Sequence, residues 1–183
     1  DTVVGDRQRF RPGSILGRGL RWVDRRACRA AERVWLDTPE HADHVASLVG
    51  LPAQRFGWVP VCDPDASPVV APYRPPAPGE CLRLLFFGTG VPLHGTELLI
   101  RGVRAADDGR LTLVGGGREA RALAADHPER IELGPDVVDR DKLDEMLTHC
   151  HAVAGVFAAR PKAQRVVPFK VVHGVAAGRP VLP

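Results

Sequence analysis

The chain has 183 residues, 44% of them hydrophobic, so it can bury one ordinary core and part of a second. A formal net charge of +3 gives no electrostatic argument for a nucleic-acid partner, and we expect none. No apolar run approaches the ~20 residues that a membrane span needs. The four cysteines are single and widely spaced, which predicts no metal site, no disulfide framework and a reducing, cytoplasmic compartment.

The first element expected along the chain is a basic helix at residues 17–34. Apolar residues recur there on one helical face, and arginines cover much of the rest. Such a helix is either a surface helix with solvated charges or one that lies on an anionic membrane surface or acceptor, and both interpretations stay open. A short apolar strand is then expected at 33–38. Thr38 suits the N-terminal cap of the helix that follows, Pro39 suits its first position, and Gly50 ends it.

A strand at 56–61 precedes a proline-rich stretch. Residues 62–79 hold six prolines and show no periodicity, which indicates a stiff linker. The predicted organisation is therefore an N-terminal domain remnant at 1–63, a linker at 64–79 and a second domain at 80–183.

From residue 80 onward, strands and helices alternate with short loops. Strands are expected at 82–87, 111–114, 130–133, 152–157 and 180–182, and helices at 96–106, 118–125, 141–149 and 168–177. This alternation predicts an α/β fold with a doubly wound, parallel, Rossmann-like sheet. In the usual strand order 3-2-1-4-5, the first and fourth strands are neighbours, and ligands bind beyond their carboxyl ends.

Two loops of contrasting character follow those neighbouring strands. The loop at 88–95 is rich in glycine, and the loop at 158–165 is basic. Lys170 falls in the first turn of the next helix, where free backbone N–H groups and the helix dipole favour an anion. Lys162 and Arg165 come just before that helix. Three cations at a helix N-terminus, facing a glycine loop, predict a phosphate-binding site.

A competing motif lies at residues 115–120, which formally fit G-x-G-x-x-A after a strand and before a helix. Glu132 would then be the acidic residue of a dinucleotide site. The motif follows the second strand rather than the switch-point strands, and Glu132 comes early for that role. An NAD-dependent oxidoreductase is kept only as an alternative.

Several motifs, in the same order along the chain, resemble the second domain of a retaining GT-B glycosyltransferase of the family 4 (group 1) type. The resemblance rests on L-L-F-F-G-T-G-V-P-L-H-G at 84–95, V-G-G-G at 114–117 and K-V-V-H-G-V-A-A-G-R-P-V at 170–181. Residues 37–38 and W-V-P-V at 58–61 are similar to the close of the family's acceptor domain. The similarity covers roughly residues 20–183.

The resemblance implies a hexosyltransferase of glycan biosynthesis with no cofactor. It would move a sugar from a nucleotide-diphosphate donor, UDP or GDP, to a glycan, lipid or small-molecule acceptor, with retention. Arg165 and Lys170 would be catalytic, because they would neutralise the leaving diphosphate. The expected donor-binding residues lie at strand ends and around the last helix: Gly88, Thr89, Gly90, His94, Gly95, Gly115, Gly117, Gly134, Lys162 and His173.

Four positions depart from the family pattern. His173 and Arg165 stand in the places of the family's two glutamates, His94 where lysine is common, and Thr89 where arginine is common. The second hypothesis is therefore a non-catalytic or degenerate nucleotide-sugar-binding module. The chain also resembles a fragment that ends on a partly exposed fifth strand, and we expect the fragment alone to be inactive. Peripheral contact with the inner face of a membrane is left open.

Overall fold

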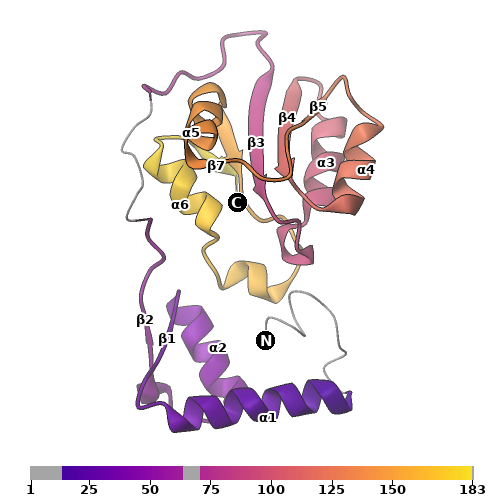
Figure 1. The fold of residues 1–183 in the computed structure, drawn as a ribbon. Helices are drawn as coiled ribbons and strands as arrows, with labels where there is room; N and C mark the ends of the chain where they lie inside the picture. Colours follow the sequence, from indigo (N-terminus) through magenta and orange to yellow (C-terminus); the bar gives the residue numbers. More distant parts are fainter. Residues whose placement is uncertain (1–13, 64–70, 183) are drawn as a thin grey trace. The chain divides into compact units, whose positions relative to one another are not determined.

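The structure, a computed structural model, describes residues 14–63 and 71–182, which divide into two units (Figure 1). The described part of unit 1 comprises residues 14–61 together with 160–167, and that of unit 2 comprises 62–63, 71–159 and 168–182. The sequence pattern did not indicate that residues 160–167 would group with unit 1. The domain boundaries predicted above stay predictions.

Unit 1 is built on two short parallel strands. Its elements are α1 (Ile15–Ala30), β1 (Val34–Leu36), α2 (Pro39–Val49), the 3-10 helices η2 (Ala53–Arg55) and η4 (Pro161–Gln164), and β2 (Phe56–Trp58). The two strands pair in parallel, with Val34 opposite Phe56.

Both ends of α2 follow the expected chemistry. The Thr38 hydroxyl accepts a hydrogen bond from the backbone N–H of His41 at 3.1 Å, and Pro39 is the first helical residue. Gly50 ends the helix in the left-handed conformation, with φ of 64°. The Thr38 hydroxyl also donates to the backbone carbonyl of Arg165. This bond joins the segment 160–167 to the helix cap.

Unit 2 is the predicted doubly wound sheet. Its elements are β3 (Leu82–Gly88), η3 (Pro92–His94), α3 (Thr96–Ala105), β4 (Gly109–Gly115), α4 (Arg118–Ala125), β5 (Ile131–Leu133), α5 (Arg140–His149), β6 (Ala152–Ala154), α6 (Phe169–Ala176) and β7 (Val181–Leu182). All pairings are parallel, and the strand order is β5-β4-β3-β6-β7. This is the 3-2-1-4-5 order that the sequence predicted.

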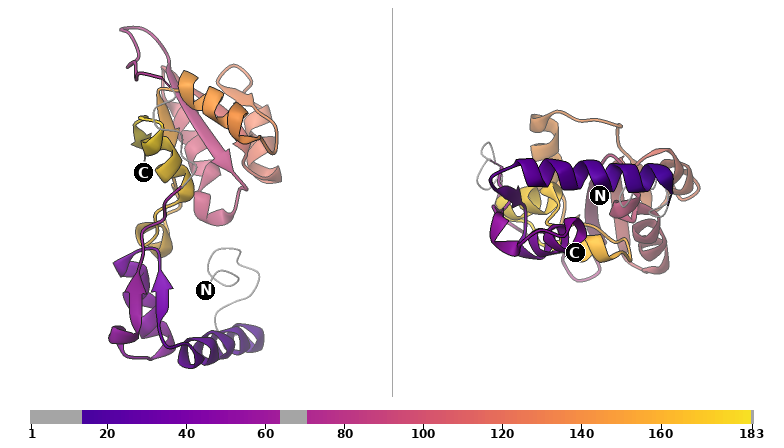
Figure 2. Two further views of the ribbon diagram at one scale, coloured as in Figure 1. Left: turned by 60° about the vertical axis from the view of Figure 1, so that its left-hand side comes forward. Right: turned by 90° about the horizontal axis from the view of Figure 1, so that it is seen from below.

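Alternate residues of β3 face two separate cores. Leu84 and Phe86 pack with residues of α3 and α4 on one face of the sheet. Leu85 packs with residues of α5 and with Ala177, which follows α6, on the other face. Figure 2 shows α3 and α4 on one side of the sheet and α5 and α6 on the other. Because both faces are covered, the carboxyl edge is where the loops of β3, β4 and β6 can form a site.

Several boundaries differ from the prediction: α1 ends at Ala30 rather than at residue 34, and β2 ends at Trp58 rather than at residue 61. Two further differences have a physical reason. β6 spans only Ala152–Ala154, because the backbone N–H of Phe157 turns away from the ladder to donate to the carbonyl of His94. α6 begins at Phe169 rather than at Pro168, which has extended backbone angles and serves as its cap. At the other edge, β7 pairs with β6 and its Leu182 is exposed.

Candidate functional site

The glycine loops after β3 and β4 pack directly on each other. The N–H of Gly116 donates to the carbonyl of Gly88 at 2.7 Å. Gly90 has a φ of 69°, and a Cβ at this residue would overlap the backbone of Gly116 and Gly117. Only glycine satisfies both the backbone angle and the close approach. The structure therefore brings together the two glycine runs that the sequence singled out.

Gly95 closes the β3 loop against the loop after β6. Its φ is 61°, and a Cβ on it would overlap the backbone of Phe157 and Ala158. It also forms the N-terminal cap of α3, without a side-chain hydrogen bond. The contact lies between the loops of the neighbouring strands β3 and β6, where strand order reverses. The predicted switch point is thus present in unit 2.

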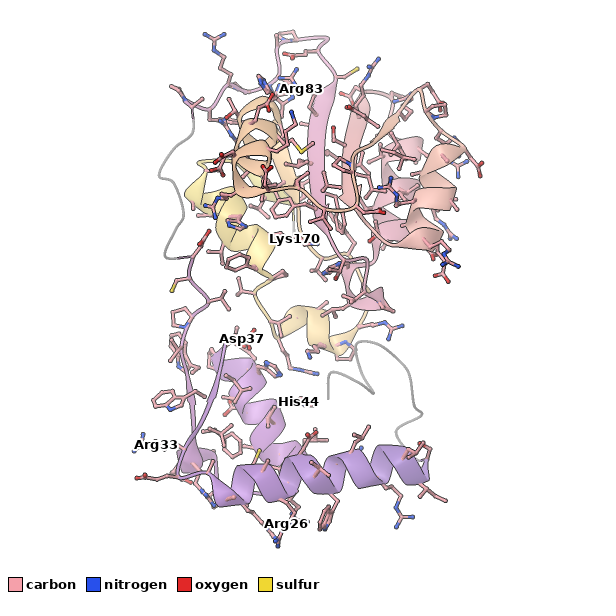
Figure 3. All side chains as sticks on the ribbon, in the orientation of Figure 1. Arg26, Arg33, Asp37, His44, Arg83 and Lys170 are labelled. Carbon is pink, nitrogen blue, oxygen red and sulfur yellow. The ribbon has the colours of Figure 1, made fainter. Side chains whose placement is uncertain are left out.

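Lys170 lies in the first turn of α6 and is almost completely buried (Figure 3). Its side chain is 5% exposed, and its Nζ has no hydrogen-bond partner among the described residues. Nζ lies 3.8 Å from the centroid of the Phe86 ring. It also lies 3.1 Å from where a Cβ on Gly88 would be. Burial lowers the pKa of Lys170 to about 7.

His94 is the second buried nitrogen group of this edge. Its ring packs edge-on against Phe86, with 5.7 Å between the ring centroids. Its Nδ1 is buried and has no partner in the described part of the chain. Burial, and then the nearby Lys170, lower the pKa of His94 to about 4. His94 is therefore neutral at physiological pH and retains an unused hydrogen-bonding position.

His173 is held by a carboxylate that the sequence analysis missed. Its Nε2 lies 2.5 Å from Oδ2 of Asp63, a side chain that is only 5% exposed. Nη1 of Arg140 lies 2.9 Å from the same oxygen. The bond to Asp63 fixes the ring and leaves Nδ1 of His173 buried without a partner among the described residues. Asp63 directly precedes the expected linker at 64–79, and no spacing signal connects it with α5 or α6.

The predicted cations Lys162 and Arg165 belong to unit 1. The backbone carbonyl of Arg165 accepts the Thr38 hydroxyl bond described above. Burial, and then Arg165, His41 and Lys162, lower the pKa of His44 on α2. Because Lys170 belongs to unit 2, the predicted grouping of three cations stays a prediction.

The remaining predicted residues lie at the same carboxyl edge of unit 2. Gly115 ends β4, Gly117 precedes α4, and Thr89 is exposed between the two glycines of the β3 loop. The N–H of Gly134, after β5, donates to the carbonyl of Leu113 at 3.0 Å. Their role in donor binding stays a prediction.

The dinucleotide alternative gains no support from the geometry. Glu132 stands in register with Thr112, in the middle of its strand rather than beyond the strand's carboxyl end. The Gly115 motif follows β4, one strand away from the switch point between β3 and β6. Among the described residues, no three His, Cys, Asp or Glu side chains gather as a metal site would require.

No protein-family model matches this sequence, and no curated protein matches it. Several solved structures match the fold of this chain. The apo form of the lipopolysaccharide outer core galactosyltransferase WaaB matches with a TM-score of 0.60 and 15% identity, over 82% of this chain and 42% of that one. Anabaena Alr3699/HepE in complex with UDP and glucose matches with a TM-score of 0.64 and 16% identity, over 90% of this chain and 47% of that one.

A second HepE structure, in complex with UDP, has a TM-score of 0.64 and 16% identity, over 96% of this chain and 50% of that one. The chain thus spans half or less of the length of these structures. At such low identity the likeness shows the fold alone, which is that of GT-B glycosyltransferases. The family 4 type and retention stay predictions.

Proposed function

We propose that this chain forms the donor-binding part of a glycosyltransferase that uses a nucleotide-diphosphate sugar. The observation that carries the proposal is the buried Lys170 amino group at the N-terminus of α6, unpartnered among the described residues and beside the glycine loop at 88–95. A buried cation without an anion is costly, and a diphosphate would supply that anion. The complex of HepE with UDP and glucose supports this choice of ligand class.

The proposed chemistry follows from where charge develops. When the bond between the sugar C1 and the β-phosphate oxygen breaks, negative charge collects on the leaving diphosphate. Lys170 and the free N–H groups of the first turn of α6 stabilise that charge in a site shielded from water. Neutral His94 donates or accepts one further hydrogen bond. Arg165 is the second proposed catalytic cation. The acceptor oxygen forms the new bond to the sugar C1 with retention, and the hydroxyl proton passes to the leaving diphosphate.

The donor class is tested by titrating the chain with UDP and GDP in a calorimeter and with NADH by nicotinamide fluorescence. We expect at least one nucleoside diphosphate to bind and NADH to leave the fluorescence unchanged. Binding of NADH without binding of either diphosphate would contradict the proposal. Sugar transfer or donor hydrolysis by the full-length protein separates a transferase from a non-catalytic binding module.

We also propose that α1 lies on an anionic membrane surface. Four large apolar side chains of this helix are exposed, among them Ile15 at 88% and Trp22 at 63%. The helix also carries five exposed arginines: Arg18, Arg21, Arg25, Arg26 and Arg29. Exposed apolar side chains and arginines on the same helix are complementary to a bilayer interface with negative headgroups. None of the described helices has both the length and the apolar character to cross a membrane.

Vesicle binding tests the membrane proposal. We expect the chain to sediment with vesicles rich in phosphatidylserine but not with pure phosphatidylcholine, and added salt should weaken binding. Trp22→Ala should reduce binding about tenfold, because it removes apolar area that the bilayer would bury. Trp58→Ala is the matched control, since Trp58 is exposed on β2 rather than on α1. Equal binding by both variants, or no binding to anionic vesicles, would refute the contact.

A further inference from the structure

The charged form of Lys170 lacks the partners that normally accompany a buried ammonium. From β3, it faces the ring of Phe86 and the bare Cα of Gly88. A ring face attracts a cation only weakly compared with the hydration that burial removes. No oxygen acceptor among the described residues hydrogen-bonds Nζ. The structure therefore favours the neutral amine in the empty site.

The titratable neighbours of Lys170 do not supply the missing negative charge. His94, from η3, is the titratable group on the segment packed against it, and its own pKa is lowered to about 4. His173, one turn further along α6, has its Nε2 on the carboxylate of Asp63. The Asp63 carboxylate also accepts a hydrogen bond from Arg140. His173 and Arg140 therefore already share this carboxylate, and it does not pair with Lys170.

We propose that Lys170 takes up a proton when a diphosphate binds, so that donor binding and protonation of this amine are coupled. The inference rests on the proposed function and concerns the regulation of the same site. The amine lone pair accepts a proton from water or buffer, and the resulting ammonium donates hydrogen bonds to phosphate oxygens. The buffer supplies the proton, so no other reactant is needed.

The direction of the pH dependence follows from two protonation states. In the empty site, burial lowers the pKa of Lys170 to about 7, and a bound anion would raise it again. Between these two values the complex holds more protons than the free chain. The affinity for a diphosphate should therefore fall as pH rises above about 7, approaching tenfold per pH unit.

The proton is counted by calorimetric titration with UDP at pH 8 in Tris and in HEPES, two buffers with different heats of ionisation. UDP is fully ionised at this pH, because the second ionisation of a phosphate monoester lies near 6. The difference in observed heat should correspond to about 0.9 proton per UDP bound, since about nine-tenths of the amines are neutral one pH unit above their pKa. At pH 6 the uptake should vanish or reverse.

A matched pair of variants assigns the proton to its residue. Lys170→Arg keeps a cation that never loses its charge, so uptake should disappear. Lys142→Arg is the control, because Lys142 is exposed and pairs with Glu145 at 2.7 Å. Equal heats in both buffers for the unaltered chain, or uptake retained in Lys170→Arg, would overturn the inference. If neither UDP nor GDP binds at any pH, the proposed function itself fails.

Discussion

Gly95→Ala is expected to lower the free energy of unfolding by about 2–4 kcal/mol. About 1–2 kcal/mol comes from holding an L-residue in the left-handed region, and the rest from displacing packed backbone. The new methyl group would overlap the backbone of Phe157 and Ala158, so the loops after β3 and β6 would have to separate. Urea unfolding measures the loss.

Substitutions at two other glycines of unit 2 separate the cost of the left-handed backbone from the cost of displacing packed backbone. Gly79→Ala has a positive φ of 82° but open space around the new methyl group, so only the conformational cost of about 1 kcal/mol should remain. Gly102→Ala, inside α3 with nothing nearby, should stabilise the chain by about 0.5–1 kcal/mol. If Gly95→Ala cost no more than Gly79→Ala, the two loops would not be packed as described.

Asp63→Ala is expected to lower the free energy of unfolding by about 2–3 kcal/mol. This is less than the loss of about 3–5 kcal/mol that follows when one partner of a fully buried ion pair is removed. The substitution removes the shared partner of His173 and Arg140. His173 would remain buried, with Nδ1 unsatisfied and with Nη1 of Arg140, at 3.1 Å, as the remaining neighbour of Nε2. Arg140 would keep its contact with Asp144 at 3.2 Å and can reach water, which reduces the cost.

The exposed pair of Lys142 and Glu145 is the comparison for this prediction. Both side chains are more than half exposed, so Glu145→Ala should leave the urea midpoint unchanged within error. Asp63→Asn keeps the shape of the side chain and removes its charge. Its loss of unfolding free energy should lie between those of Asp63→Ala and Glu145→Ala. An Asp63→Ala chain as stable as the original would show that the carboxylate does not hold His173.

The strand order and the glycine loops could be predicted because they are written in local patterns. Alternating strand and helix periodicity with short loops leaves few topologies, and the switch point then follows from strand order. Lys170 and the loop at 88–95 were found by that route. The caps of α2 were equally local, since Thr38, Pro39 and Gly50 each act within one turn.

Other features depend on contacts between distant residues, which spacing does not encode. Asp63 contacts residues on two helices far along the chain, although the sequence placed it at the end of the N-terminal domain remnant, next to the linker. The segment 160–167 groups with unit 1 although it lies between strands of unit 2. The near-complete burial of Lys170 was also not predictable, because a lysine in a helix is normally solvated.

The central claim, that Lys170 binds the diphosphate of a nucleotide donor, is tested most directly by the affinity of the chain for UDP. Lys170→Met keeps the length of the side chain and removes its charge, and it should weaken binding about 10- to 100-fold, the usual worth of a charged hydrogen bond. Lys142→Met, at an exposed position, should bind UDP as tightly as the unaltered chain. Equal affinity for UDP in the two variants would contradict the claim.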